Sequence, residues 1–147
     1  RNRVWLRLVR RRAVMAILAI TDRSERSQQE LPMSLIAVEA AITVADPSTR
    51  QALIDRSAPI QKATRDDEPG CLVYCFAADP CQDDLIQVYE LWESEEALAE
   101  HFEHQNYFDM RTMLNDGGLT GAVSRKHRID ASAPVYNADH TPNADFA

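Results

Sequence analysis

Two histidines three positions apart, His101 and His104, follow a segment that ends in Trp92-Glu93-Ser94. Apolar residues alternate up to Trp92 and acidic residues crowd in directly after it, so we expect a strand to end there and a helix to begin. An imidazole with a pKa of about 6.5 can accept a proton at neutral pH. Residues of these types at this spacing are compatible with a metal site, a catalytic pocket or the wall of a small core.

A metal site would use His101 and His104 as two ligands from one helix. Structural and catalytic zinc sites take three or four protein ligands. No third ligand is evident here, because Glu100 and Glu103 face other sides of the expected helix. We therefore predict no metal site.

His101 is the leading candidate for a catalytic base or hydrogen-bond partner. On a helix over residues 94–114 it would share one continuous inward face with Leu98, Phe102, Gln105 and Phe108. A buried imidazole needs a hydrogen-bond partner, so His101 is also compatible with a satisfied core residue. Glu39 is the one polar residue in an apolar strand. It is a second candidate base, unless it points outward from an edge strand.

Aromatic side chains could form the walls of a pocket or donate hydrogen bonds within it. We expect Trp92, Tyr74 and Tyr107 to contact a substrate, together with Phe102 and His104. A Trp buries a large apolar area wherever it lies. Trp92 is therefore also compatible with a core anchor at the junction of strand and helix.

The elements that must position these residues follow from the periodicity of the sequence. Strands are predicted over residues 34–44, 71–78, 85–93 and 121–129. One helix is expected to start at Pro47 and to end before the turn Glu68-Pro69-Gly70, and a second to span residues 94–114. Pro59 should kink or divide the first helix, because proline removes a backbone hydrogen bond. This order predicts an α+β, ferredoxin-like βαββαβ fold with a four-stranded antiparallel sheet.

The face of the sheet opposite the helices should also be covered. Both side-chain sets of the first three strands contain large apolar residues, so we expect a second copy to pack there as a homodimer. Arg125, Lys126 and Arg128 alternate on the last strand and are expected to line a solvent face or the rim of the dimer.

Charge is divided unevenly along the chain. Residues 1–32 contain eight Arg and three acidic residues, whereas residues 33–147 contain eight Lys or Arg and twenty Asp or Glu. The acidic part is not expected to bind nucleic acid, because phosphate contacts need clustered Lys and Arg. Residues 1–32 form a basic leader that we expect to lie outside the fold, as sequence upstream of a start at Met33, a targeting segment or a genuine arm. Its apolar run, residues 13–20, is shorter than the roughly 20 residues that cross a membrane, so no membrane partner is predicted.

Three cysteines, Cys71, Cys75 and Cys81, give an odd count with no paired framework. On one strand Cys71 and Cys75 would share a face but lie roughly 13 Å apart, beyond the reach of a disulfide. We expect both to be buried strand residues in a reduced, cytoplasmic protein.

The stretch from Glu68-Pro69-Gly70-Cys71 through the segment 90–98 to His101 resembles the antibiotic biosynthesis monooxygenase family, including its small bacterial quinol monooxygenases. The resemblance covers residues 33–130 and leaves residues 131–147 as an irregular tail. It implies a dimeric α/β barrel with a pocket between each sheet and its helices. Characterised members oxidise polycyclic phenols, anthrones or quinols with molecular oxygen, without metal or flavin.

The resemblance thus implies a cofactor-independent monooxygenase that acts on a small aromatic hydroquinone, phenol or anthrone with O2. Such an enzyme must bind the substrate, help remove a proton and hold the anion away from water, because the anion reacts with oxygen far more readily than the neutral phenol. Alternatives are a non-catalytic dimeric binding protein and a protein that isomerises or dehydrates a reactive small molecule. The haem-degrading branch is disfavoured, because Glu39 or Ala40, His101 and Arg111 stand where that branch has Asn, Trp and His.

Overall fold

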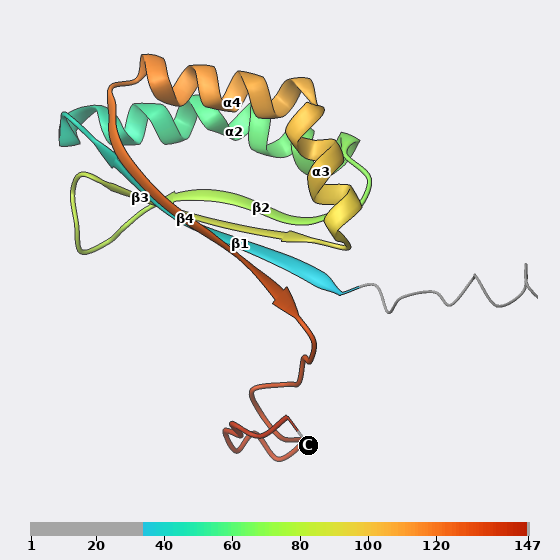
Figure 1. Cartoon of the computed structure of the whole chain (residues 1–147). Coiled ribbons are helices and arrows are strands. Elements are labelled where there is room, and N and C mark those ends of the chain that lie inside the picture. The colour runs from blue at the N-terminus through green and yellow to red at the C-terminus, as the bar shows by residue number, and fades with distance from the viewer. Residues whose placement is uncertain (1–33, 147) are drawn as a thin grey trace, which may run out of the picture. The chain divides into compact units, whose positions relative to one another are not determined.

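Four antiparallel strands form a single sheet in the order β2-β3-β1-β4. The computed structural model describes residues 34–146, so the expected leader, residues 1–32, lies outside the described residues. The strands are β1 (Leu35–Val44), β2 (Cys71–Ala78), β3 (Leu85–Trp92) and β4 (Leu119–Ile129). Figure 1 shows this sheet beneath the helices. The predicted ferredoxin-like α+β fold is confirmed.

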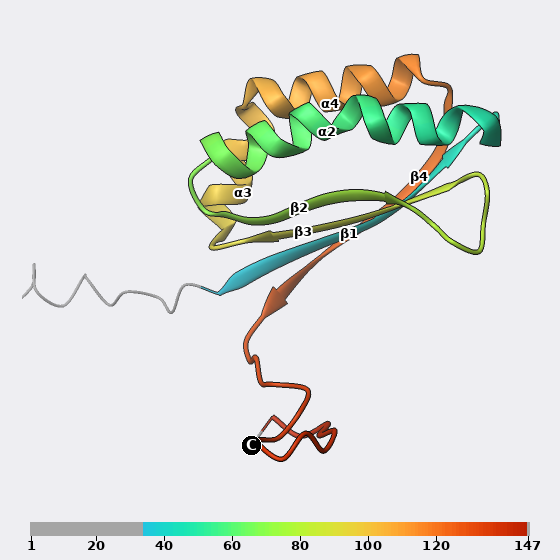
Figure 2. The ribbon, with the colours of Figure 1, turned by 180° about the vertical axis from the view of Figure 1, so that it is seen from behind.

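The helices of residues 34–146 all lie on one face of the sheet, as the opposite view in Figure 2 also shows. They are the short η1 (Pro47–Thr49), α2 (Arg50–Asp67), α3 (Glu95–Glu103) and α4 (Gln105–Asp116). The core fills the space between helices and sheet and consists of Ile36, Ile42, Val44, Leu53, Tyr74, Phe76, Ile86, Val88, Trp92, Leu98, Met110, Met113 and Leu114. Within residues 34–146, no helix is both long and apolar enough to cross a membrane.

The single helix predicted over residues 94–114 is wrong, because the structure divides it at His104. That residue has extended backbone angles (φ −82°, ψ 148°), and its side chain accepts a hydrogen bond from the backbone N–H of Asn106 to cap α4. The expected continuous face is therefore broken. Leu98 and His101 are buried, whereas Phe102 and Phe108 are 41% and 43% exposed.

Three further expectations are corrected. Of the kink or division expected at Pro59, the division is wrong, because α2 is one helix that includes this proline. Strand β1 lies between β3 and β4, so Glu39 is exposed on the helix-free face of an interior strand and not on an edge strand. Cys75 is exposed and Cys71 only half-buried, although both were expected to be buried; all three cysteines are free.

Gly70 sets the path of the chain from α2 into β2. Its φ of +80° is unfavourable for residues with a side chain, and an added Cβ would lie 2.6 Å from the Cβ of Ala97. Its carbonyl oxygen accepts a hydrogen bond of 2.9 Å from the backbone N–H of Glu93, just before α3 begins. This turn therefore holds the end of α2 against the start of α3.

We expect Gly70→Ala to lower the free energy of unfolding by about 3 kcal/mol, from left-handed backbone strain together with the steric overlap. Gly118→Ala is the matched control, because Gly118 has a similar φ of +83° but no atom within 4 Å of an added Cβ. It should cost only about 1 kcal/mol of backbone strain. Urea denaturation of both variants measures the difference, and equal losses would contradict the close packing at Gly70.

Candidate active site

A buried histidine–glutamate pair lies at the centre of the candidate site. The Nδ1 atom of His101, on α3, lies 2.6 Å from Oε2 of Glu68, the C-cap residue directly after α2. The other oxygen of Glu68, Oε1, accepts a hydrogen bond of 2.9 Å from the side-chain amide of Asn106 on α4. Both Glu68 and His101 are buried. The carboxylate thus joins three helices through one hydrogen-bonded group.

The Glu68 carboxylate orients the imidazole of His101. A carboxylate accepts hydrogen bonds, so the proton of the neutral ring lies on Nδ1 and Nε2 keeps its lone pair. Within residues 34–146, Nε2 makes no hydrogen bond. Burial lowers the pKa of His101 below its usual value, although the hydrogen bond and the charge of Glu68 act in the opposite direction. The result is a neutral imidazole whose second nitrogen can take a proton.

Four aromatic rings surround His101. The ring centroids of Trp92, Tyr74, Tyr107 and Phe102 lie 4.6, 5.2, 5.3 and 5.9 Å from that of His101. Burial, reinforced by the charge of Glu90, raises the pKa of Tyr74 far above its usual range, so its phenol stays neutral. The structure thus gathers His101 and four of the residues predicted from the sequence to contact a substrate.

The two other predicted residues have different surroundings. His104 lies beside the pair, with its Nδ1 3.2 Å from Oε1 of Glu68. That nitrogen already accepts a hydrogen bond from the backbone of Asn106, so a neutral His104 cannot also donate from it to the carboxylate. Glu39 lies on the opposite face of the sheet, where its Oε1 is 3.2 Å from Nε2 of His127. The structure therefore does not bring Glu39 and His101 together.

Three residues of this site, Glu68, Asn106 and Glu90, were not predicted from the sequence. Glu90 is buried and accepts a hydrogen bond of 3.1 Å from the indole N–H of Trp92. Burial raises its pKa from 4.5 to about 7; the Trp92 hydrogen bond lowers it and the charge of Glu68 raises it. One signal was present, because alternation along β3 places Glu90 on the same face as Trp92. Glu68 was assigned only to a turn.

The same two carboxylates affect Cys71 at the start of β2. Partial burial, with the nearby charges of Glu68 and Glu90, raises the pKa of its thiol to about 11. Cys71 therefore remains protonated at neutral pH.

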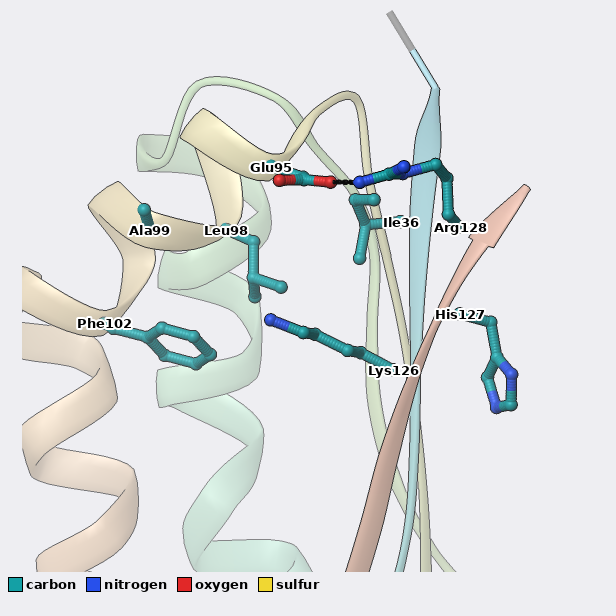
Figure 3. Close-up of a pocket in the computed structure, with 8 residues that line it drawn as sticks. All are labelled: Ile36, Glu95, Leu98, Ala99, Phe102, Lys126, His127 and Arg128. Carbon is teal, nitrogen blue, oxygen red and sulfur yellow. Dashed lines mark hydrogen bonds and ion pairs between the residues drawn. The ribbon is translucent and has the colours of Figure 1, made fainter. Parts of the chain in front are cut away.

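A pocket of about 570 Å³ opens between α3 and the adjoining ends of β1 and β4 (Figure 3). Its lining residues are Ile36, Glu95, Leu98, Ala99, Phe102, Lys126, His127 and Arg128. An ion pair between Arg128 and Glu95 joins β4 to α3 beside it. Phe102 belongs both to the pocket and to the group of rings around His101, since its ring lines the pocket and also packs against His101.

No group of three or more His, Cys, Asp and Glu side chains within residues 34–146 is arranged to hold a metal ion. The polar atoms around His101 are instead satisfied by one another, through Glu68 and Asn106. The chemistry that this arrangement supports best is proton transfer to and from the imidazole.

The raised pKa of Glu90 predicts a loss of stability with rising pH. Because the native state holds this proton more tightly than the unfolded state, the free energy of unfolding should fall between pH 4.5 and about 7 and stay lower above that. We expect Glu90→Gln to be about 2 kcal/mol more stable than the wild type at pH 8 and equal to it at pH 5. Urea denaturation at both pH values measures this.

Glu100→Gln is the control for that experiment, because Glu100 is exposed on α3. It should leave the pH dependence of stability unchanged. A Glu90→Gln variant that keeps the wild-type pH dependence would show that Glu90 does not carry the proton.

Comparison with solved structures identifies proteins of similar fold. Rv0793 from Mycobacterium tuberculosis is 24% identical, with 71% of this chain and 99% of that chain covered and a TM-score of 0.54. PA3566 from Pseudomonas aeruginosa is 23% identical over 69% and 99% of the two chains, with a TM-score of 0.58. SnoaB from Streptomyces nogalater, a cofactor-independent oxygenase, is 14% identical over 69% and 98%, with a TM-score of 0.53. No curated protein sequence matches the chain.

At these identities the similar structures establish the fold alone. The family match is more specific, because the antibiotic biosynthesis monooxygenase family model matches residues 35–112. That range is more than half of the chain and contains Glu68, Trp92, His101 and Asn106. As the resemblance of the sequence implied, the chain belongs to the antibiotic biosynthesis monooxygenase family.

Proposed function

We propose that this protein is a cofactor-independent monooxygenase that oxidises a small aromatic hydroquinone, phenol or anthrone with O2. The observation that carries the proposal is the neutral, buried imidazole of His101, which Glu68 orients with Nε2 free to accept a proton. SnoaB, a protein of the same fold, is a cofactor-independent oxygenase, which supports the same reaction type. The proposed setting is the cytoplasm.

In the proposed reaction, Nε2 of His101 takes the proton of a phenolic or enolic hydroxyl. The resulting anion passes one electron to O2, the substrate radical and superoxide combine to form a C–O bond, and the O–O bond of the resulting peroxide then breaks. One oxygen atom stays on the substrate carbon and the other leaves as water. The substrate supplies both hydrogens of that water and all four electrons, so the balance requires no further reductant.

The four aromatic rings around His101 suit this chemistry because they keep water away from the imidazole that takes the proton. The neutral phenol of Tyr74 and the indole of Trp92 provide nonionised walls next to the imidazole. Phe102 stands between the imidazole and the pocket, and its side chain is 41% exposed. In our proposal a rotation of Phe102 connects the pocket to Nε2.

A dimeric binding protein without catalysis is the second candidate. The enclosure of His101, which is only 2% exposed, favours it, because a histidine that Glu68 holds in the core for packing alone would have the same surroundings. The same pocket would then bind an aromatic ligand with no consumption of oxygen.

Oxygen uptake by the purified, metal-free protein with a panel of hydroquinones and anthrones tests the proposal. We expect uptake that chelators do not affect. His101→Asn retains an amide that can bond to Glu68 but lacks the basic nitrogen, so it should lower turnover at least about 100-fold while changing the melting temperature by only a few degrees.

His140→Asn, in the C-terminal tail, is the matched control and should keep wild-type turnover. Equal losses of turnover and stability in His101→Asn would indicate a packing role for His101. Saturable quenching of the intrinsic tryptophan fluorescence without oxygen uptake would favour the binding protein.

We also propose that the protein works as a homodimer joined through the helix-free faces of its sheets. Tyr89 and Val123 lie on that face and are 46% and 69% exposed. Large apolar side chains on an open sheet are typical of an interface with another protein surface.

Tyr89→Glu should weaken this dimer, because it would bury an unpaired charge at a cost of about 3 kcal/mol, which is ~100-fold in Kd. Sedimentation equilibrium of the full chain measures it. Tyr136→Glu, at an exposed tyrosine of the tail, should leave the dimer intact. A monomeric wild type, or a Tyr89→Glu variant that remains dimeric, would contradict this interface.

A further inference from the structure

We propose that the pocket between α3 and β4 binds an aromatic anion whose charged oxygen contacts the ammonium group of Lys126. This inference rests on the proposed function, because it names the substrate class that the same site takes. It concerns ionised phenols specifically, and it gives Lys126 a direct contact with the substrate.

The register of β4 directs Lys126 toward the helices. Lys126 pairs with Val38 and Arg128 with Ile36, and both partners lie on the side of β1 that packs against the core. Arg125 and His127 alternate with them and face the helix-free side. In Figure 3 the Lys126 side chain extends from β4 toward α3, with Nζ between Leu98 and Phe102.

The charges around the pocket leave one cation uncompensated. Arg128 pairs with Glu95, and the His127 ring turns away from the pocket toward Glu39. Lys126 has no ion pair within residues 34–146. The lining therefore carries a net positive charge, concentrated at Nζ of Lys126.

The apolar residues of the pocket determine which kind of ligand fits beside Lys126. Ile36, Leu98, Ala99 and Phe102 form an apolar lining around the ammonium group. The volume of about 570 Å³ lies in the range of small-molecule sites. The ring of Phe102 can stack against another aromatic ring. An aromatic ligand with one anionic oxygen would therefore complement both the apolar lining and the ammonium group of Lys126.

This contact would promote the proposed reaction. A cation within about 4–6 Å of a phenolic oxygen favours the ionised form and lowers the pKa of the bound phenol. The ionised form is the one that O2 oxidises readily. Nε2 of His101 would accept the proton, and the ammonium group of Lys126 would stabilise the negative charge that remains on the substrate.

A chromophore that reports its own ionisation tests this inference. 4-Nitro-1-naphthol absorbs at longer wavelength when ionised, so absorbance against pH gives its pKa free and bound. We expect the wild-type protein to lower that pKa by about one unit. Lys126→Gln should abolish the shift, and Lys126→Arg should retain it.

Two controls separate the effect of the Lys126 charge on the anion from the binding of the aromatic rings. The methyl ether of 4-nitro-1-naphthol cannot ionise and should bind equally to the wild type and Lys126→Gln. Lys62→Gln removes another exposed lysine, on α2, and should leave the shift unchanged. A wild-type protein that does not bind the naphthol, or a Lys126→Gln variant that keeps the shift, would overturn the inference.

Oxygen uptake, measured separately, distinguishes the two proposals. If Lys126 shifts the pKa of the bound naphthol but no quinol causes uptake of oxygen, the aromatic-anion site would be supported and the oxygenase rejected. Uptake that Lys126→Gln leaves unchanged would support the oxygenase and reject the role of Lys126.

Discussion

The buried Glu68 carboxylate is the group on which the arrangement of the site depends. A charged group in a protein interior costs several kcal/mol unless hydrogen bonds compensate it. Here the compensation comes from His101 on α3 and Asn106 on α4. The break at His104 lets both helices direct a donor at the same carboxylate, so the irregular junction is what satisfies the buried charge.

The fold and part of the site could be predicted because their signals are local. Alternation along β3 and the acidic first turn of α3 located Trp92 and His101. The role of Glu68 could not be predicted, because its partners lie 33 and 38 positions away and no local pattern joins them. Lys126 was predicted only to line a solvent face or the rim of the dimer. Its place in the pocket could not be predicted, because alternation along a strand does not say which face meets the helices.

His101 and Lys126 have different surroundings, although Phe102 lies next to both of them. Around His101, apolar rings and low exposure keep the imidazole and Tyr74 neutral. Around Lys126, an open pocket keeps a charged ammonium group in contact with solvent. Phe102 touches both, so its side chain is the boundary between a site that favours neutral groups and one that attracts an anion.

The partial burial of Cys71, together with the nearby carboxylates of Glu68 and Glu90, also affects how easily this cysteine is oxidised. Oxidation of cysteine to sulfenic acid and beyond proceeds through the thiolate. The thiol of Cys71, with its pKa raised to about 11, is almost entirely protonated at neutral pH. If the proposed oxidation takes place in this domain, the sulfur atom of Cys71 should react only slowly with oxidants and quinones, because little of it is thiolate.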